Sequence, residues 1–227
     1  LSGNKLSVLD VTKGIVYTIL TTNKSYSPVG SFKDAKLLAT SERGVFVATE
    51  NGIWNEKKRV IPKENTGQLR VFASFSSNIY TVDKENSKIF KYIPDSSETF
   101  VRKEYLVKGV EADFANALDM AIDGSVYVLF SNGEILKFLE GRPDAFAYSQ
   151  VDPPLRSAQR IFTNKDSEFV YVLDKDKSRV VVLKKNGEYQ AQYRWSGMQD
   201  VVDLVVTEED KKLLLLSGKK IYNIDLK

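Results

Sequence analysis

Short runs of alternating apolar and polar residues recur in pairs along the chain. The clearest pair is "SVYVLFS" at residues 125–131 and "EILKFLE" at residues 134–140, separated by the dipeptide Asn-Gly. Asn-Gly between two such runs is the strongest short signal for a β-hairpin, because both residues of a two-residue type I′ turn need a positive φ. Residues 125–140 are therefore predicted to form a β-hairpin.

Four further segments show the same pairing of strand-like runs, at residues 44–59, 78–94, 168–187 and 212–227. The second apolar position of each first run gives a series of equivalent residues: Phe46, Tyr80, Tyr127, Tyr171 and Leu214. Successive members of this series are 34, 47, 44 and 43 residues apart. A nearly constant spacing of this size indicates an internal repeat, each copy being one supersecondary unit.

A further short apolar run precedes each hairpin, and another follows it in the middle repeats. Four strands per repeat are typical of a β-propeller blade, and no window keeps helical spacing for more than about two turns. We therefore predict an all-β chain, residues 1–227, forming a single β-propeller domain of about five four-stranded blades. Six blades, one of them incomplete, is the alternative.

The two ends of the chain are expected to close the propeller by joining in one blade. Residues 5–22 look like the last two strands of a blade, and the C-terminal segment looks like the first three. The third strand is then supplied twice, by residues 6–9 and by residues 221–226.

The repeats resemble those of NHL-type and related β-propellers, which pair a run like "LDMAIDGSVYVLFSNG" with a later strand like "GEILKF". Residues 118–138 and 159–183 match this pattern best, and the first interval of 34 residues departs from it. More loosely, the chain is similar to propeller domains of bacterial membrane-anchored proteins. Neither resemblance implies a catalytic residue, because propellers are scaffolds that carry many unrelated functions.

Composition excludes several kinds of chemistry. The 227 residues contain no Cys and no His, which removes disulfides, thiolate metal sites, cysteine nucleophiles and the commonest general base. We therefore expect no metal and no cofactor. The formal charge of +3 comes from 33 basic and 30 acidic residues whose basic pairs are scattered, so no nucleic-acid partner is expected.

The longest apolar stretches, such as "LLLL" at residues 213–216, are far too short to insert in a membrane. The chain opens on "LSGNKLSVLD", so we expect a domain excised from a longer chain. With no Cys, we favour an extracytoplasmic location, or anchoring to a membrane through a segment outside this chain, and the cytoplasm is the alternative.

The starts of the five repeats align so that one position is always charged. The aligned residues are Lys36, Arg70, Asp119, Arg160 and Asp203. In a propeller the first strand of each blade lines the central channel, so these side chains are expected to converge at one end of it. Two interpretations stay open. The charges form a structural ring of ion pairs with trapped water, or they form a binding mouth of mixed charge.

The connections that lead into the first strands are expected to lie over the same end. They are residues 21–34, 106–116, 151–157 and 194–200, and they carry Tyr26, Phe114 and Trp195. Aromatic side chains on loops are enriched at protein interfaces, so these three residues are predicted to contact a partner. The alternative is that each ring packs back between the blades.

Two functions follow. The first is a non-catalytic module that binds or senses a protein, peptide or glycan, with another domain of the same chain as a further candidate partner. The second is a glycan hydrolase in which Asp119 and Asp203 act as acid and base across a glycosidic bond. Basic neighbours are expected to lower the pKa of both carboxyl groups, which opposes a general acid and favours the first function.

Overall fold

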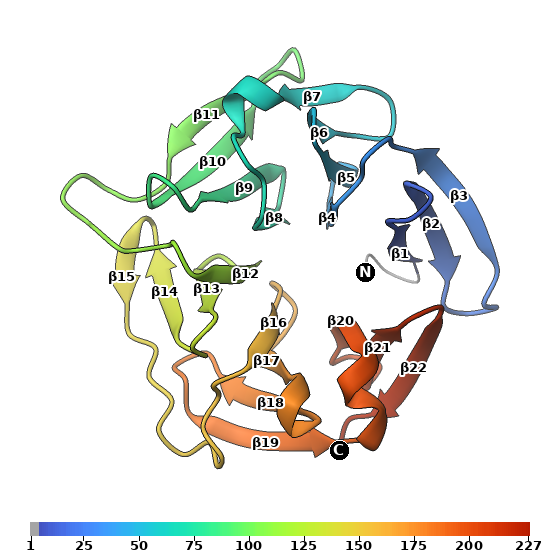
Figure 1. Ribbon diagram of the computed structural model, residues 1–227, viewed down its shortest axis with the longest axis vertical. Coiled ribbons are helices and arrows are strands. Elements are labelled where there is room, and N and C mark those ends of the chain that lie inside the picture. Colours follow the sequence, from blue (N-terminus) through green and yellow to red (C-terminus); the bar gives the residue numbers. More distant parts are fainter. Residues whose placement is uncertain (1–4) are drawn as a thin grey trace. The chain divides into compact units, whose positions relative to one another are not determined.

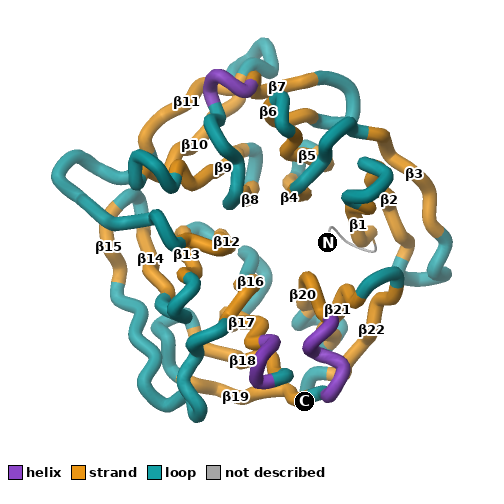
Figure 2. Tube along the Cα trace, viewed as in Figure 1, coloured by secondary structure: helices purple, strands orange, loops and turns teal. Residues whose placement is uncertain are grey.

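The computed structural model describes residues 5–227 and contains two compact units, the first ending at Leu106 and the second spanning Val107–Lys227. Strands dominate both units (Figure 2), and the three helices found in residues 5–227 are 3₁₀ helices of at most five residues. The prediction of an all-β chain is confirmed. Among the described residues no helix is long and apolar enough to span a bilayer.

Unit 1 contains three antiparallel sheets whose strands pair in chain order (Figure 1). The first sheet is β1 (Lys5–Asp10), β2 (Ile15–Leu20) and β3 (Tyr26–Ser31). The second is β4 (Leu37–Ser41), β5 (Gly44–Thr49), β6 (Gly52–Trp54) and β7 (Arg59–Pro62), followed by helix η1 (Lys63–Asn65). The third is β8 (Phe72–Phe75), β9 (Asn78–Asp83), β10 (Lys88–Pro94) and β11 (Phe100–Glu104). The first strands are neighbours, since β4 contacts both β1 and β8.

Unit 2 repeats this plan. Its first sheet is β12 (Ala117–Ile122), β13 (Val126–Phe130), β14 (Ile135–Leu139) and β15 (Arg142–Asp144). The second is β16 (Ala158–Phe162), β17 (Phe169–Asp174), β18 (Arg179–Lys184) and β19 (Tyr189–Arg194), with helix η2 (Lys175–Lys177) between β17 and β18. Helix η3 (Ser196–Asp200) leads to the third sheet, β20 (Val201–Thr207), β21 (Lys212–Ser217) and β22 (Lys220–Asp225). Here β16 contacts both β12 and β20.

Each sheet is one blade of a β-propeller fold, and of the two blade counts that the sequence left open the structure has six. Four blades have four strands, and the first and last have three. Residues 5–22 form the first two strands of their blade, not the last two, because β3 pairs with β2 as the third strand. A local turn closes β1 and β2 into a hairpin. In that turn the Asp10 carboxylate accepts hydrogen bonds from the backbone N–H groups of Thr12 and Lys13. Each terminus therefore has its own three-stranded blade, where one shared blade was expected.

The cores lie between adjacent blades and are built mainly by the second strands. Every residue of β13 is buried, and its Tyr127 packs with Ile161 and Val170 of the following blade. Alternation along a strand directs side chains to both faces of its sheet, so β17, whose side chains enter clusters with both neighbouring blades of unit 2, is apolar in all but its last residue. Of the five equivalent positions of the repeats, four are buried: Phe46, Tyr80, Tyr127 and Tyr171.

Candidate functional site

The first strands of unit 2 share a local distortion. In β12, β16 and β20 the pairing with the second strand shifts by one residue just before a charged position. The charged residues are Asp119, Arg160 and Asp203, which lie opposite Leu129, Leu173 and Leu216. A β-bulge of this kind leaves one residue unpaired and re-aims the side chains that follow it. The three predicted residues of unit 2 therefore occupy equivalent positions for a common backbone reason.

Lys36 and Arg70 of unit 1 do not occupy that position, so this part of the predicted alignment is wrong. In unit 2 the residue two positions before the strand partner of Tyr127, Tyr171 or Leu214 is charged. The corresponding residues of unit 1, two positions before the partners of Phe46 and Tyr80, are Leu37 and Val71. The first strands β4 and β8 of unit 1 pair without the bulge that adds one residue to the first strands of unit 2. A sequence alignment that ignores this extra residue therefore matches Lys36 and Arg70 to the wrong position. Lys36 is exposed and its Nζ lies 2.7 Å from Glu50 Oε1, and Arg70 is exposed before β8 begins.

The three charged residues of unit 2, which we call the charged trio, connect neighbouring first strands. The Asp119 carboxylate accepts a hydrogen bond of 2.9 Å from the backbone N–H of Ile161, so it links β12 to β16. Arg160 Nε lies 3.9 Å from Asp203 Oδ1, which places opposite charges of β16 and β20 side by side at the limit of an ion pair. Within the trio, Asp119 therefore makes a short hydrogen bond to the next blade, whereas Arg160 and Asp203 make only a long contact with each other.

Electrostatics distinguishes the two carboxyl groups from ordinary surface carboxylates. Desolvation raises the pKa of Asp119 to about 6, against the lowering effects of the Arg160 guanidinium and the Ile161 N–H, and the nearby Asp203 carboxylate raises it further. Desolvation also raises the pKa of Asp203, with Arg160 opposing the shift. The expectation that basic neighbours lower both pKa values is therefore wrong at Asp119, where loss of hydration outweighs the attraction of one guanidinium.

Exposure separates the roles of the trio. The side chains of Arg160 and Asp203 are 39% and 60% exposed, so water and ligands reach both. Asp119 is only partly exposed, and one of its oxygens is already occupied by the Ile161 N–H. A ligand can therefore contact Arg160 and Asp203. Asp119 mainly connects two neighbouring blades through its hydrogen bond with Ile161.

A polar hollow of about 390 Å³ lies on the first blade of unit 2. It is lined by Asp113, Asn116, Phe130, Ser131, Asn132, Glu134 and Leu136. These residues come from the segment that enters β12 and from the β13–β14 turn, which the sequence identified only as a hairpin turn. In residues 5–227 no group of three or more His, Cys, Asp or Glu side chains is placed to hold a metal ion.

The three aromatic residues predicted to contact a partner have different surroundings. Tyr26 is 72% exposed and belongs to unit 1, where it begins β3 and meets the Tyr17 ring edge-on. Phe114 is fully buried with its ring centroid 6.1 Å from that of Phe130, so its assignment to an exposed surface is wrong. Trp195 is partly buried against Tyr222, with 4.5 Å between the ring centroids.

Sequence reasoning missed a buried ion pair in unit 2. Arg179 and Asp174 are both 0% exposed, and Arg179 Nε donates to Asp174 Oδ2 over 2.9 Å. The same guanidinium donates to the backbone carbonyls of Asp152 and Pro153, and Ser157 Oγ donates to Asp174. These bonds fix the connection that precedes β16 and Arg160. The one signal in the sequence is an arginine at the head of the apolar run "VVVL".

Comparison with known proteins identifies the fold. No family model matches the chain, and no curated protein sequence matches it. Nidogen, from a structure of a nidogen/laminin complex, is 10% identical with a TM-score of 0.55, covering 86% of this chain and 82% of that chain. A luciferin-regenerating enzyme is 13% identical with a TM-score of 0.63, covering 94% and 80% of the two chains.

A third similar structure is virginiamycin B lyase from Staphylococcus aureus, 12% identical with a TM-score of 0.59, covering 98% of this chain and 80% of that chain. At these identities the similarity shows the fold alone, a six-bladed β-propeller. The similar structures include both enzymes and a protein found in a complex with another protein, so the fold does not decide between catalysis and binding.

Proposed function

We propose that this chain is a non-catalytic binding module that recognises a ligand through Arg160 and Asp203 on the first strands of unit 2. The observation that carries the proposal is the loose contact between these two exposed side chains, 3.9 Å apart. Arg160 Nη1 also donates to the Gln159 carbonyl over 3.0 Å, and Asp203 Oδ1 accepts the Leu204 N–H over 2.9 Å. A guanidinium has five N–H donors and a carboxylate accepts several hydrogen bonds, so both groups keep free capacity for a ligand.

The chemistry of the pair favours a ligand that carries both charges. A ligand carboxylate fits the planar donors of Arg160, and a ligand ammonium group fits Asp203. A peptide terminus or another zwitterionic group meets both demands. Nidogen, a propeller of the same fold, is found in a complex with laminin, which is a precedent for binding by such a scaffold.

We also propose a class of partner and a location for the chain. The partner is a protein, a peptide or a glycan, or another domain of the same chain, and the location is extracytoplasmic. We also propose that the chain is related to NHL-type propellers, whose repeats residues 118–138 and 159–183 resemble.

The test is a titration of the ¹⁵N-labelled protein with triglycine and, separately, with maltotriose. The proposal expects triglycine to shift the amide signals of residues around Arg160 and Asp203, with a Kd on the order of 1 mM for so small a probe. N-acetylated, C-amidated triglycine is the matched control and should shift none of them. Equal shifts with the capped and free peptides, or shifts confined to other surfaces, would reject the charged pair as the site.

A glycan hydrolase is the second candidate, and one observation favours it. A carboxyl group with a pKa of about 6, such as Asp119, is suited to act as a general acid near neutral pH. Its hydrogen bond from Ile161 restricts that role. Release of reducing sugar from an oligosaccharide panel, lost in both Asp119→Asn and Asp203→Asn, would establish this candidate in place of the binding module.

A further inference from the structure

Within residues 5–227 the last blade of unit 2 has three strands, and the outer side of β22, with which no strand pairs, is an open sheet edge. The third strand of the preceding blade, β18, has a fourth strand beside it, and five of its six residues are buried. None of the six residues of β22 is buried. In the described chain β22 is therefore exposed because no fourth strand covers its outer side.

The direction of the backbone groups on β22 follows from its pairing. The N–H of Leu226 donates to the carbonyl of Lys211 over 2.8 Å, just beyond the paired residues Asp225 and Lys212. Residues that face the partner strand alternate with residues that face away in an antiparallel pair. The N–H and C=O groups of Ile221, Asn223 and Asp225 therefore point outward, as an uninterrupted template for another strand.

The other three-stranded blade has an edge that cannot act in this way. In unit 1 the N–H of Leu20 donates to the carbonyl of Ser25, so the backbone groups of Tyr26 and Pro28 point away from β2. Pro28 has no N–H, and proline at an outward edge position blocks the addition of a strand. β22 contains no proline. The edges of β3 and β22 therefore differ in whether a proline blocks the addition of another strand.

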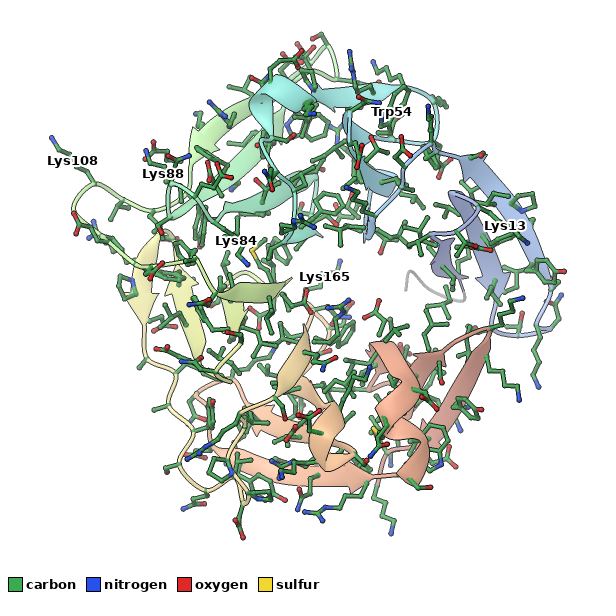
Figure 3. All side chains as sticks on the ribbon, in the orientation of Figure 1. Lys13, Trp54, Lys84, Lys88, Lys108 and Lys165 are labelled. Carbon is green, nitrogen blue, oxygen red and sulfur yellow. The ribbon has the colours of Figure 1, made fainter. Side chains whose placement is uncertain are left out.

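Charge indicates what kind of strand the β22 edge would accept. In two complete blades a lysine of the third strand pairs with an acid of the fourth. Lys88 of β10, labelled in Figure 3, pairs with Glu104 of β11, and Lys137 Nζ of β14 lies 2.6 Å from Asp144 Oδ2 of β15. Lys220 occupies the third strand of the last blade and is exposed, and no ion pair of it is found within residues 5–227.

We propose that β22 is a docking edge for an extended, acidic segment of a partner protein, which adds to the last blade as its fourth strand. The outward groups of Ile221, Asn223 and Asp225 supply the ladder of hydrogen bonds, as in other strand-addition complexes. An acidic side chain of the segment pairs with Lys220, and Ile221, which is 37% exposed, is covered by an apolar neighbour. The edge is separate from the charged trio and does not depend on the function proposed for it.

The probe is a fluorescent peptide of about seven residues that alternates glutamate with valine, matched to one strand. Its termini are capped, so it has side-chain carboxylates but lacks the ammonium group that Asp203 is proposed to recognise. We expect saturable binding by fluorescence anisotropy, and protection of the Ile221, Asn223 and Asp225 amides from hydrogen exchange. A peptide N-methylated at alternate residues should not bind, because it lacks the ladder donors.

The decisive variant is Asn223→Pro, which copies on β22 the arrangement that Pro28 gives β3. It removes one outward N–H that no strand of the described chain uses, so the melting temperature should stay close to that of the wild type. Peptide affinity should fall by about tenfold or more. Asn223→Thr keeps the N–H and is the matched control. Binding unchanged in Asn223→Pro, or no binding to the wild type, would overturn the proposal.

A charge reversal tests the acidic character of the segment. Lys220→Glu should weaken the glutamate peptide several-fold and strengthen a peptide in which lysine replaces glutamate. Equal preference for the two peptides in both proteins would contradict the proposed charge pairing. Self-association of the wild type that Asn223→Pro abolishes would assign the edge to a second copy of the chain and overturn the assignment to a partner protein.

Discussion

The first strands of the two units carry different residues at one register position. In unit 1 the position is held by Leu37, which packs against an apolar cluster, and by Val71, which is 1% exposed. In unit 2 the position follows a bulge and is charged in all three blades. A bulge lets the strand place a charged side chain beside the core without breaking the apolar alternation of the rest of the strand. The same repeat therefore carries an apolar residue at this position of the first strand in unit 1 and a charged residue in unit 2.

A second difference lies in the cores. Among residues 5–227 the buried charged side chains are Asp174 and Arg179, and both belong to unit 2. The buried polar residues of unit 1 are the threonines Thr49, Thr66 and Thr81. Unit 2 thus uses buried charge to hold a connection in place, and unit 1 uses apolar packing with single hydroxyl groups.

The largest expected effect comes from breaking the buried pair of unit 2. Arg179→Met leaves the Asp174 carboxylate buried without its partner and should lower the free energy of unfolding by about 3–5 kcal/mol. Urea denaturation of the purified proteins gives this quantity. Arg59→Met, at an exposed arginine of unit 1, is the control and should change stability by less than about 0.5 kcal/mol.

Adding Asp174→Leu to Arg179→Met should restore part of the lost stability, because no unpaired charge then remains. A double variant that is less stable than Arg179→Met would contradict this account of the network.

A smaller effect tests how firmly the connection before β16 is held in unit 2. Gly133 and Gly109 have φ values of +89° and +87°, so alanine is strained at both. A Cβ at Gly133 would lie 1.7 Å from the Leu155 carbonyl oxygen, whereas a Cβ at Gly109 would meet nothing within 4 Å. Gly109→Ala should cost about 1 kcal/mol from backbone strain alone, and Gly133→Ala about 3 kcal/mol. Equal melting temperatures for the two variants would show that the backbone at Leu155 moves away from the new Cβ at little cost in stability.

The hairpins of the fold could be predicted from the sequence because their signals are local. Alternation and turn residues located the five hairpins, and the repeat spacing identified aromatic positions, from Phe46 to Tyr171, that are buried in the structure. Residues 5–22 were assigned to the wrong strands of a blade, because two strands and a turn do not reveal which edge of a sheet they occupy.

The candidate site could be predicted only in part, because a bulge leaves no local signal. Asp119, Arg160 and Asp203 were aligned correctly, but Lys36 and Arg70 were placed one residue out of register where the strands lack the bulge. The burial of Phe114 depends on Phe130 and Phe138, which pairing of distant segments brings to it. Such contacts are set by tertiary packing, which a repeat pattern does not specify.

The stability of the protein should depend on pH because of Asp119, one of the charged residues on the first strands of unit 2. The folded-state pKa of Asp119, about 6, is raised above its ordinary value of 3.8, so the folded protein binds the proton more tightly than the unfolded chain. Stability should therefore fall as pH rises from about 4 to 6 and stay lower above that range. Asp119→Asn can still accept the Ile161 N–H and removes the charge. It should be more stable than the wild type by about 1 kcal/mol at pH 7.5, a value reduced for partial exposure, and equal to it near pH 4.

Urea denaturation across this pH range checks the prediction. A variant that is less stable than the wild type at pH 7.5 would show that the ionised carboxylate stabilises the fold, contrary to the desolvation argument.

The central claim is that Arg160 and Asp203 of unit 2 form a binding surface, and that Arg70 of unit 1, which lies one residue out of register, is not part of one. The most direct measurement compares Arg160→Gln with Arg70→Gln in the triglycine titration, with melting temperatures recorded in parallel. The account predicts that Arg160→Gln weakens binding by about tenfold or more while melting changes little, and that Arg70→Gln changes neither. Equal loss of binding in both variants would contradict it, and so would an Arg160→Gln protein that melts earlier yet binds as tightly as the wild type.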